Sequence, residues 1–149
     1  RKPKMVNWQT DELKSSELQA ELSVPLLEGL LLNAFDSITI TSAEQSSSYG
    51  DWPITFVNAA FEKMTGYSKE EAIGNTPKML QGPKTDQELV DRLARDVSEG
   101  RIFHGETVNY RKDGSEFVIE WKVVPITGDL GEIVQYLAIQ RDVTAERRG

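Results

Sequence analysis

The chain has 149 residues, 38% of them hydrophobic and 28% charged, which is the size and composition of one compact domain. A formal net charge of −7 disfavours binding to nucleic acid phosphates and to anionic membrane surfaces. The lack of cysteine excludes disulfides and thiolate chemistry, and a single histidine excludes a zinc site built on several imidazoles. No apolar run reaches the ~18 residues of a membrane span and no signal segment is present, so we expect a cytoplasmic protein without nucleic-acid or membrane partners.

Residues 1–24 predict an N-terminal extension with a flanking surface helix. Its thin apolar stripe in a charged background consists of Leu13, Leu18 and Leu22. A second helix is expected to begin at Ser23, because serine caps a helix N-terminus well and Pro25 fits the first turn. This helix is apolar nearly all round as far as about Ala34, so it must be covered on more than one side.

The middle of the chain changes from a strand pattern to a helix pattern. Apolar and polar residues alternate from Ser37 and again over residues 54–57, which predicts a β-hairpin across a serine-rich loop. Capping boxes at Ser68 and Thr85, each with a glutamate three residues later, predict two helix N-termini. The second box opens an amphipathic helix that ends before Gly100.

The C-terminal third has the pattern of three long strands joined by tight turns. The strands are predicted over residues 102–111, 116–126 and 132–143. Two strands, several short helices and three further strands, in this order, predict an α+β fold. We expect a five-stranded antiparallel sheet with the helices on one face.

Residues 74–83 hold too much glycine and proline for a long helix, and they resemble a known loop. The sequence Gly74-Asn-Thr-Pro-Lys-Met-Leu-Gln-Gly-Pro83 is similar to the flavin loop of light-oxygen-voltage (LOV) domains, a branch of the PAS sensor family, usually G-x-N-C-R-F-L-Q-G-P. Other segments resemble the family in the right order: Val57-Asn-Ala-Ala-Phe61, Thr65-Gly-Tyr67, Val108-Asn-Tyr-Arg-Lys-Asp-Gly114 and Ile139-Gln-Arg-Asp-Val-Thr144. The resemblance implies a PAS domain over residues 25–144, with residues 145–149 beginning a linker to an output region.

The resemblance also implies a ligand, FMN or another flavin, and the residues that would bind it. Asn109 matches an asparagine at the far edge of the flavin ring, and Gln140 matches the glutamine at its reactive edge. Gln81 is kept in the flavin loop, and Lys78 replaces the arginine that clamps the flavin phosphate. Thr76 replaces the asparagine before the photoreactive cysteine.

Three departures from the family pattern limit this implication. Pro77 stands where the family has the photoreactive cysteine, so no thiol adduct with a flavin can form. Ile119 replaces a second asparagine at the ring edge. Ala94 replaces a second phosphate-binding arginine, although Arg92 and Arg95 lie on the same predicted helix.

Alternation along the last strands separates an inner from an outer face. Counting in twos places Asn109, Gln140 and Val134 on the inner face. An inward amide needs a hydrogen-bond partner, which a flavin edge, another amide or water would supply. The outer row is predicted to contain Ile133, Gln135, Leu137 and Ile139.

Other readings of the polar candidates stay open. Gln81 and Lys78 fall on a loop, where the alternative is a solvated surface patch. His104 falls on a strand with no carboxylate or hydroxyl partner that the sequence identifies, so we expect an ordinary strand residue. No spacing pairs carboxylates for acid–base work and no phosphate loop or nucleophile motif occurs, so we do not expect an enzyme.

These observations predict a cytoplasmic sensory module that relays a signal through its terminal helices to an effector domain. Because residues 133–139 are apolar on both faces, we expect the helix at residues 26–32 to pack on the outer face of the sheet and to pair with a second chain in a homodimer. The alternative is a ligand-free PAS module that serves dimerisation and protein interaction. A visible absorption spectrum distinguishes these two predictions.

Overall fold

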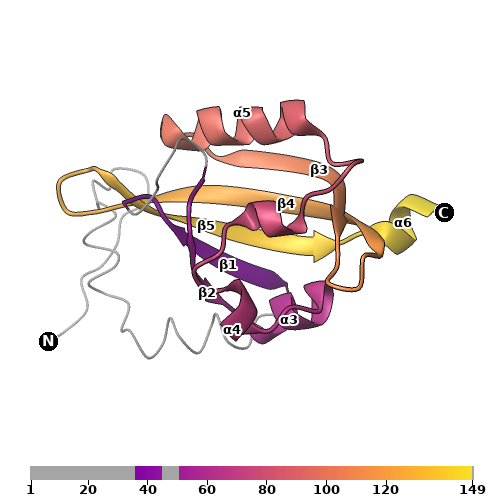
Figure 1. Cartoon of the computed structure of the whole chain (residues 1–149). Coiled ribbons are helices and arrows are strands. Elements are labelled where there is room, and N and C mark those ends of the chain that lie inside the picture. The colour runs from indigo at the N-terminus through magenta and orange to yellow at the C-terminus, as the bar shows by residue number, and fades with distance from the viewer. Residues whose placement is uncertain (1–35, 45–50, 149) are drawn as a thin grey trace, which may run out of the picture.

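The computed structural model describes residues 36–44 and 51–148. One antiparallel sheet contains five strands in the order β2-β1-β5-β4-β3 (Figure 1). The strands are β1 (Ser37–Ser42), β2 (Ile54–Val57), β3 (Phe103–Tyr110), β4 (Glu116–Thr127) and β5 (Ile133–Asp142). The predicted hairpin and the three C-terminal strands are confirmed, whereas the two helices predicted before Ser37 lie outside the described residues.

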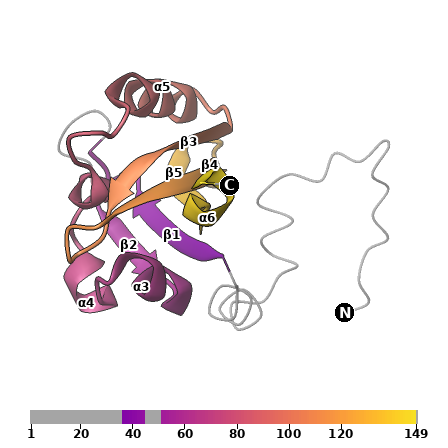
Figure 2. The ribbon, with the colours of Figure 1, turned by 90° about the vertical axis from the view of Figure 1, so that its right-hand side faces the viewer.

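Short helices connect β2 to β3 and lie along one face of the sheet, as the sequence predicts (Figure 2). They are α3 (Ala59–Thr65), α4 (Lys69–Ala72), the 3-10 helix η1 (Pro77–Leu80) and α5 (Gln87–Ser98). The last helix, α6 (Thr144–Arg148), follows β5 directly and contacts β4. The described part of the chain contains no helix with the length and apolar character that a membrane span requires.

The core consists of two hydrophobic clusters on the inner face. The larger cluster joins α5 to the sheet through Val97, Phe103, Phe117, Ile119, Trp121, Val123 and Tyr136. The smaller cluster joins β2 to the helices through Ile54, Val57, Phe61, Ala72 and Leu80. Burying side chains of this size contributes roughly 1.5–3 kcal/mol each, so these clusters fix the helices against the sheet.

The start of α5 differs from the prediction by one residue. The sequence predicts Thr85 as the N-cap, but Asp86 caps the helix and its side chain accepts a hydrogen bond from the Leu89 N–H at 3.1 Å. The buried Thr85 hydroxyl instead donates to the Val108 carbonyl of β3 at 2.6 Å. A buried hydroxyl needs a hydrogen-bond partner, and the Val108 carbonyl of the neighbouring strand supplies it. The adjacent carboxylate of Asp86 then caps the helix N-terminus. The other predicted capping box, Ser68 with Glu71, is confirmed.

A β-bulge changes which residues of β5 face outward. Ile126 lies opposite Gln135 and Thr127 opposite Ile133, so Val134 is left over in the pairing with β4. A bulge residue shifts the alternation by one position. The prediction that Ile133 lies on the outer face is therefore wrong, because Ile133 packs against the larger core cluster.

Side chains and loops occupy the backbone groups along both outer edges of the sheet. On β3, Thr85 bonds the Val108 carbonyl, and the Arg92 guanidinium donates to the His104 carbonyl at 3.2 Å. On β2, the Ile54 N–H donates to the Asn75 carbonyl at 2.7 Å, and the Ile54 carbonyl accepts from the N–H of residue 74 at 2.9 Å. The edges of the sheet are thus partly satisfied within the domain.

Candidate ligand pocket and C-terminal anchor

A pocket of about 460 Å³ lies between η1 and α5 and is the first candidate site. It is lined by Trp52, Pro77, Lys78, Gln81, Gln87, Val90, Asp91, Leu93, Ala94 and Arg95. Its volume is within the range of roughly 300–1,000 Å³ that is usual for small-molecule sites. The lining combines amide groups, apolar side chains, one indole ring and charged side chains, so it suits an aromatic ligand that carries an anionic group.

Local sequence explains how η1 forms one wall of the pocket. Pro77 occupies the first position of the 3-10 helix, where its fixed backbone angle is favourable. Leu80 is buried in the smaller core cluster, which anchors the other end of η1. Lys78 is exposed and Gln81 is half-buried, and both line the pocket. The side-chain oxygen (Oε1) of Gln81 accepts a hydrogen bond from the side-chain amide of Gln87 at 3.4 Å, which connects the end of η1 to the start of α5.

The structure separates the sequence-predicted site residues into two groups. Lys78 and Gln81 line the pocket, whereas Thr76 lies just before η1 and is not part of this lining. Asn109 and Gln140 are buried in the interior, with 8% and 6% of their surfaces exposed, so the predicted inward orientation is confirmed.

Both inward amides have hydrogen-bond partners within the protein. The Gln140 side-chain oxygen accepts bonds from the hydroxyls of Ser37 at 2.8 Å and Thr39 at 3.0 Å. The Asn109 side-chain oxygen accepts a long bond from the Thr85 hydroxyl at 3.4 Å. The sequence does not indicate these hydroxyl partners, because β1 is remote in sequence from Gln140 and residue 85 is remote from Asn109.

Aromatic rings fill the interior between α5 and the sheet. Trp121 lies beside Gln140 in the pairing of β4 with β5, and its ring centroid is 5.1 Å from that of Phe103. Gly105 is opposite Trp121 on β3, and a side chain there would come within 2.6 Å of the Phe103 ring. Trp52 lines the pocket and packs on Tyr136 with 4.3 Å between ring centroids. Trp52 therefore connects the lining of the pocket to the aromatic residues of the interior.

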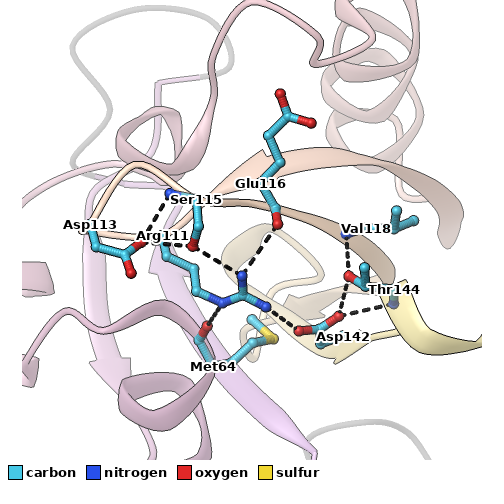
Figure 3. Close-up of polar contacts among 8 residues, drawn as sticks. All are labelled: Met64, Arg111, Asp113, Ser115, Glu116, Val118, Asp142 and Thr144. Atoms are coloured by element: carbon cyan, nitrogen blue, oxygen red, sulfur yellow. Dashed lines mark hydrogen bonds and ion pairs between the residues drawn. The ribbon is translucent and has the colours of Figure 1, made fainter. Parts of the chain in front are cut away.

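A second candidate site is the polar cluster around Arg111, where β3 ends (Figure 3). Its guanidinium donates to the Met64 carbonyl of α3 at 3.2 Å and to the Asp142 carboxylate at the end of β5 at 2.6 Å. It also donates to the Ser115 hydroxyl in the turn before β4 and to the Glu116 carbonyl at the start of β4. The guanidinium carbon lies 4.9 Å from the centroid of the buried Phe117 ring. One side chain thus holds α3, the β3–β4 turn and β5 together.

Asp142 extends this cluster to α6. Its other carboxylate oxygen accepts from the Thr144 N–H at 3.0 Å and hydroxyl at 2.6 Å (Figure 3). The Thr144 hydroxyl in turn accepts from the Val118 N–H at 2.8 Å, and Val143 is buried. Desolvation by burial raises the pKa of Asp142, but the hydrogen bonds from Thr144 and Arg111 outweigh it and leave this pKa below its ordinary value. The carboxylate is therefore held in its charged form, and it fixes the direction in which α6 leaves the sheet.

Charged side chains hold α6 against the outer face. Glu106 on β3 and Glu120 on β4 are direct cross-strand partners, an arrangement in which like charges repel. Arg147 of α6 donates two hydrogen bonds to the Glu106 carboxylate, at 2.7 and 2.8 Å, and these bonds lower the pKa of Glu106. The Glu120 carboxylate lies 3.6 Å from the Arg141 guanidinium and 3.3 Å from Nε2 of His104.

His104 therefore does have a carboxylate partner, contrary to the sequence reading. The contact with Glu120 is cross-strand and arises from the register of β3 with β4, which local sequence does not fix. The side chain is 62% exposed, so it remains a surface strand residue.

Comparisons with known proteins assign the chain to a family. The model of the PAS domain matches residues 36–145. The solved LOV domain of the blue-light activated histidine kinase of Erythrobacter litoralis EL346 is 34% identical, with a TM-score of 0.67, and the match covers 73% of this chain and 96% of that one. The chain belongs to the PAS family, in its light-oxygen-voltage branch. This is the family that the flavin-loop motif at residues 74–83 resembles.

Longer relatives and further structures extend the comparison. The LOV-like domain is 40% identical over 121 residues to a blue-light photoreceptor of Listeria monocytogenes, covering 81% of this chain and 46% of that protein. It is 35% identical over 127 residues to phototropin-2 of Oryza sativa subsp. japonica, covering 85% of this chain and 14% of that protein. The structure of an RNA-binding light-oxygen-voltage receptor matches with a TM-score of 0.77 at 26% identity, covering 86% of this chain and 35% of that one. The chain therefore spans less than half of these relatives.

Proposed function

We propose that this LOV-like domain is a cytoplasmic sensory module without catalytic activity, which binds a flavin such as FMN non-covalently in the pocket between η1 and α5. The single observation that carries the proposal is the lining itself, which sets Lys78, Gln81 and Arg95 around apolar walls and the Trp52 ring. A bound flavin would supply visible-light absorption and redox chemistry. In this chain Pro77 lines the pocket and has no nucleophile, so the ligand would be held by packing, hydrogen bonds and charge alone.

We propose further that the domain, over residues 25–144, relays a signal through α6 to an effector. Gln140 and Asp142 lie two residues apart on β5, the first on the inner face and the second bonded to Arg111 and Thr144. A change in the hydrogen bonds of Gln140 would move this end of β5, and the Arg111 cluster would pass the movement to α6. Gln140, Asn109 and Thr76 do not line the pocket, so all three would respond to the ligand indirectly, through the residues packed between them and the pocket.

A second candidate function is that of a ligand-free interaction domain. It is favoured by the aromatic layer around Trp121 and by the hydroxyl partners of Gln140, which satisfy the interior without a ligand. Both candidate functions are compatible with the charge of −7, which disfavours nucleic acid and anionic membranes as partners.

A visible absorption spectrum of the freshly purified chain is the first test. We expect the bands of oxidised flavin, and blue light should cause at most reversible photoreduction, because the chain contains no cysteine. A bleached spectrum of the thiol-adduct type would contradict the proposal. A colourless protein that also fails to bind added FMN or riboflavin would favour the ligand-free domain.

We also propose that the outer face of the sheet is covered by the apolar segment at residues 26–32 and that this segment mediates homodimerisation. Leu137 and Ile139 are half-buried on this face, opposite Ile40 and Ile38 of β1. Leu137→Lys should place a charge among these apolar side chains, so we expect dissociation to a monomer or a lower melting temperature, with little change in any flavin spectrum. Light scattering and thermal unfolding measure this, with Gln135→Lys on the same face as the control. An unchanged size and melting temperature for Leu137→Lys would show that the face is not an interface.

A further inference from the structure

A cavity of about 360 Å³ lies between α3 and the adjoining ends of β1 and β5, and it shares no residue with the pocket between η1 and α5. The start of β1 and the end of β5 meet here because Ser37 is the register partner of Gln140. The third wall is one face of α3, to which Ala60, Lys63 and Met64 contribute at the spacing of one helical turn. The volume of this cavity is usual for a small-molecule site.

The buried amide of Gln140 lines this cavity and has an unused hydrogen-bond donor. Gln140 is 6% exposed, and its side-chain bonds from Ser37 and Thr39 both go to Oε1. Nε2 has no hydrogen-bond partner among the residues that the structure describes. This nitrogen is not sealed from solvent, because every fully buried side-chain nitrogen or oxygen in the described residues has a partner. The Gln140 donor therefore indicates a place for an acceptor in the cavity.

Two opposite charges line the same cavity without neutralising each other. Lys63 lies on α3, Asp36 immediately precedes β1, and both residues are exposed. In the described part of the chain, no ion pair joins these two side chains or connects either of them to another residue. The other two charged residues of the lining, Arg141 and Asp142, already have partners of opposite charge. Of these four charged residues, Lys63 and Asp36 are therefore the two that are available to a ligand.

We infer that this cavity binds a small zwitterion with an apolar side chain, of the α-amino acid class. The Lys63 ammonium and Nε2 of Gln140 bind the carboxylate of the ligand, and the Asp36 carboxylate binds its ammonium group. Ala60 and Met64 pack against the apolar side chain of the ligand. A carboxylate without an ammonium group fits less well, because Asp36 then repels it.

Such a ligand gives the domain an input that depends neither on light nor on a flavin. Gln140 and Asp142 both line the cavity, and Asp142 holds the start of α6 through its bonds from Thr144. A carboxylate bound to Nε2 of Gln140 therefore lies next to the residues that set the direction of α6. The cavity thus connects a second ligand to the same output helix.

Isothermal titration of the full chain with L-leucine, isocaproate and isoamylamine tests this site. Isocaproate lacks the ammonium group of leucine and isoamylamine lacks its carboxylate, while all three share the apolar chain. We expect saturable binding of L-leucine that is at least about tenfold tighter than that of either analogue. Lys63→Gln should weaken leucine binding about tenfold, and Gln140→Leu about fivefold. Lys69→Gln is the matched control, because Lys69 is exposed on α4 and does not line the cavity.

The outcomes of these titrations are distinct. A wild type that does not bind L-leucine at millimolar concentration would overturn the inference, as would equal affinities for L-leucine and isocaproate. Leucine binding that is equally strong in Lys63→Gln and Lys69→Gln would also overturn it. Because Lys63 is exposed, its variant should keep the wild-type melting temperature, so its lost affinity cannot come from unfolding even if Gln140→Leu is unstable.

A parallel titration with FMN separates this site from the proposed flavin pocket. Leucine binding by a chain that binds no flavin would support the cavity beside α3 and contradict the flavin proposal alone. FMN binding by a chain that does not bind leucine would overturn the cavity site and leave the flavin proposal standing.

Discussion

Replacing Asn58 with alanine is expected to lower the free energy of unfolding by about 2–4 kcal/mol. The side-chain oxygen of this residue, which is 1% exposed, accepts hydrogen bonds from the N–H groups of Ile38 at 2.8 Å and Phe61 at 3.1 Å. Its amide donates to the Asp36 carbonyl at 3.0 Å. Alanine would remove the N-cap of α3 and also leave a buried N–H of β1 without its partner.

Urea unfolding followed by circular dichroism measures this loss. Asn75→Ala is a matched control, because the exposed Asn75 amide also bonds a carbonyl, that of Glu71 at 2.7 Å. We expect the control to lose less than about 1 kcal/mol, since water replaces an exposed hydrogen bond. Equal losses for the two variants would show that Asn58 does not connect α3 to β1 energetically.

Replacing Arg111 with glutamine is expected to destabilise the domain by about 2–3 kcal/mol and to loosen α6. Glutamine cannot make the set of bonds that Arg111 makes to α3, the β3–β4 turn and Asp142. Hydrogen–deuterium exchange should accelerate at residues 143–148 more than at the centre of the sheet. Arg101→Gln is the control, because its ion pairs with Asp96 and Glu99 are on the surface and should contribute less than about 1 kcal/mol.

The loss of stability caused by Arg111→Gln should depend on pH. The folded-state pKa of Asp142 is lowered, so its contribution to stability is full above the unfolded value of about 3.9 and is lost as the pH falls through the folded value. Without Arg111 the folded pKa rises toward the unfolded one, and this contribution shrinks. The stability difference between wild type and Arg111→Gln should therefore be largest near neutral pH and decrease in acid. A difference independent of pH would show that Asp142 does not take part.

The sequence predicts the sheet and its helices because each strand and turn has a local pattern, and the loop motif adds the family. Three details depend instead on contacts between distant segments. Thr85 bonds β3 rather than capping α5, and the bulge at Val134 reverses the side of Ile133. The contact of His104 with Glu120 comes from strand register. None of these has a signature within a short window of sequence.

The sequence predicts the candidate site only in part, again because some of its contacts join segments that are distant in the sequence. Lys78 and Gln81 lie where the loop motif implies, because η1 is a local structure. The inward orientation of Gln140 follows from alternation, but its bonds to β1 depend on the pairing of β1 with β5. The sequence shows Arg95 only as a neighbour of Ala94, and helical spacing alone does not decide whether Arg95 or Arg92 lines the pocket.

The partly satisfied edges of the sheet have a consequence for assembly. An open edge strand is a template on which a strand from another molecule can add, in β-augmentation, domain swapping or aggregation. Here the backbone of Ile54 on β2 is occupied by the loop at residues 74–75, and the His104 and Val108 carbonyls on β3 are occupied by Arg92 and Thr85. A long strand added at either edge would have to compete with these bonds and with the side chains and loop that make them. A partner is therefore directed to the broad face of the sheet, where side chains rather than backbone ladders decide which surface fits.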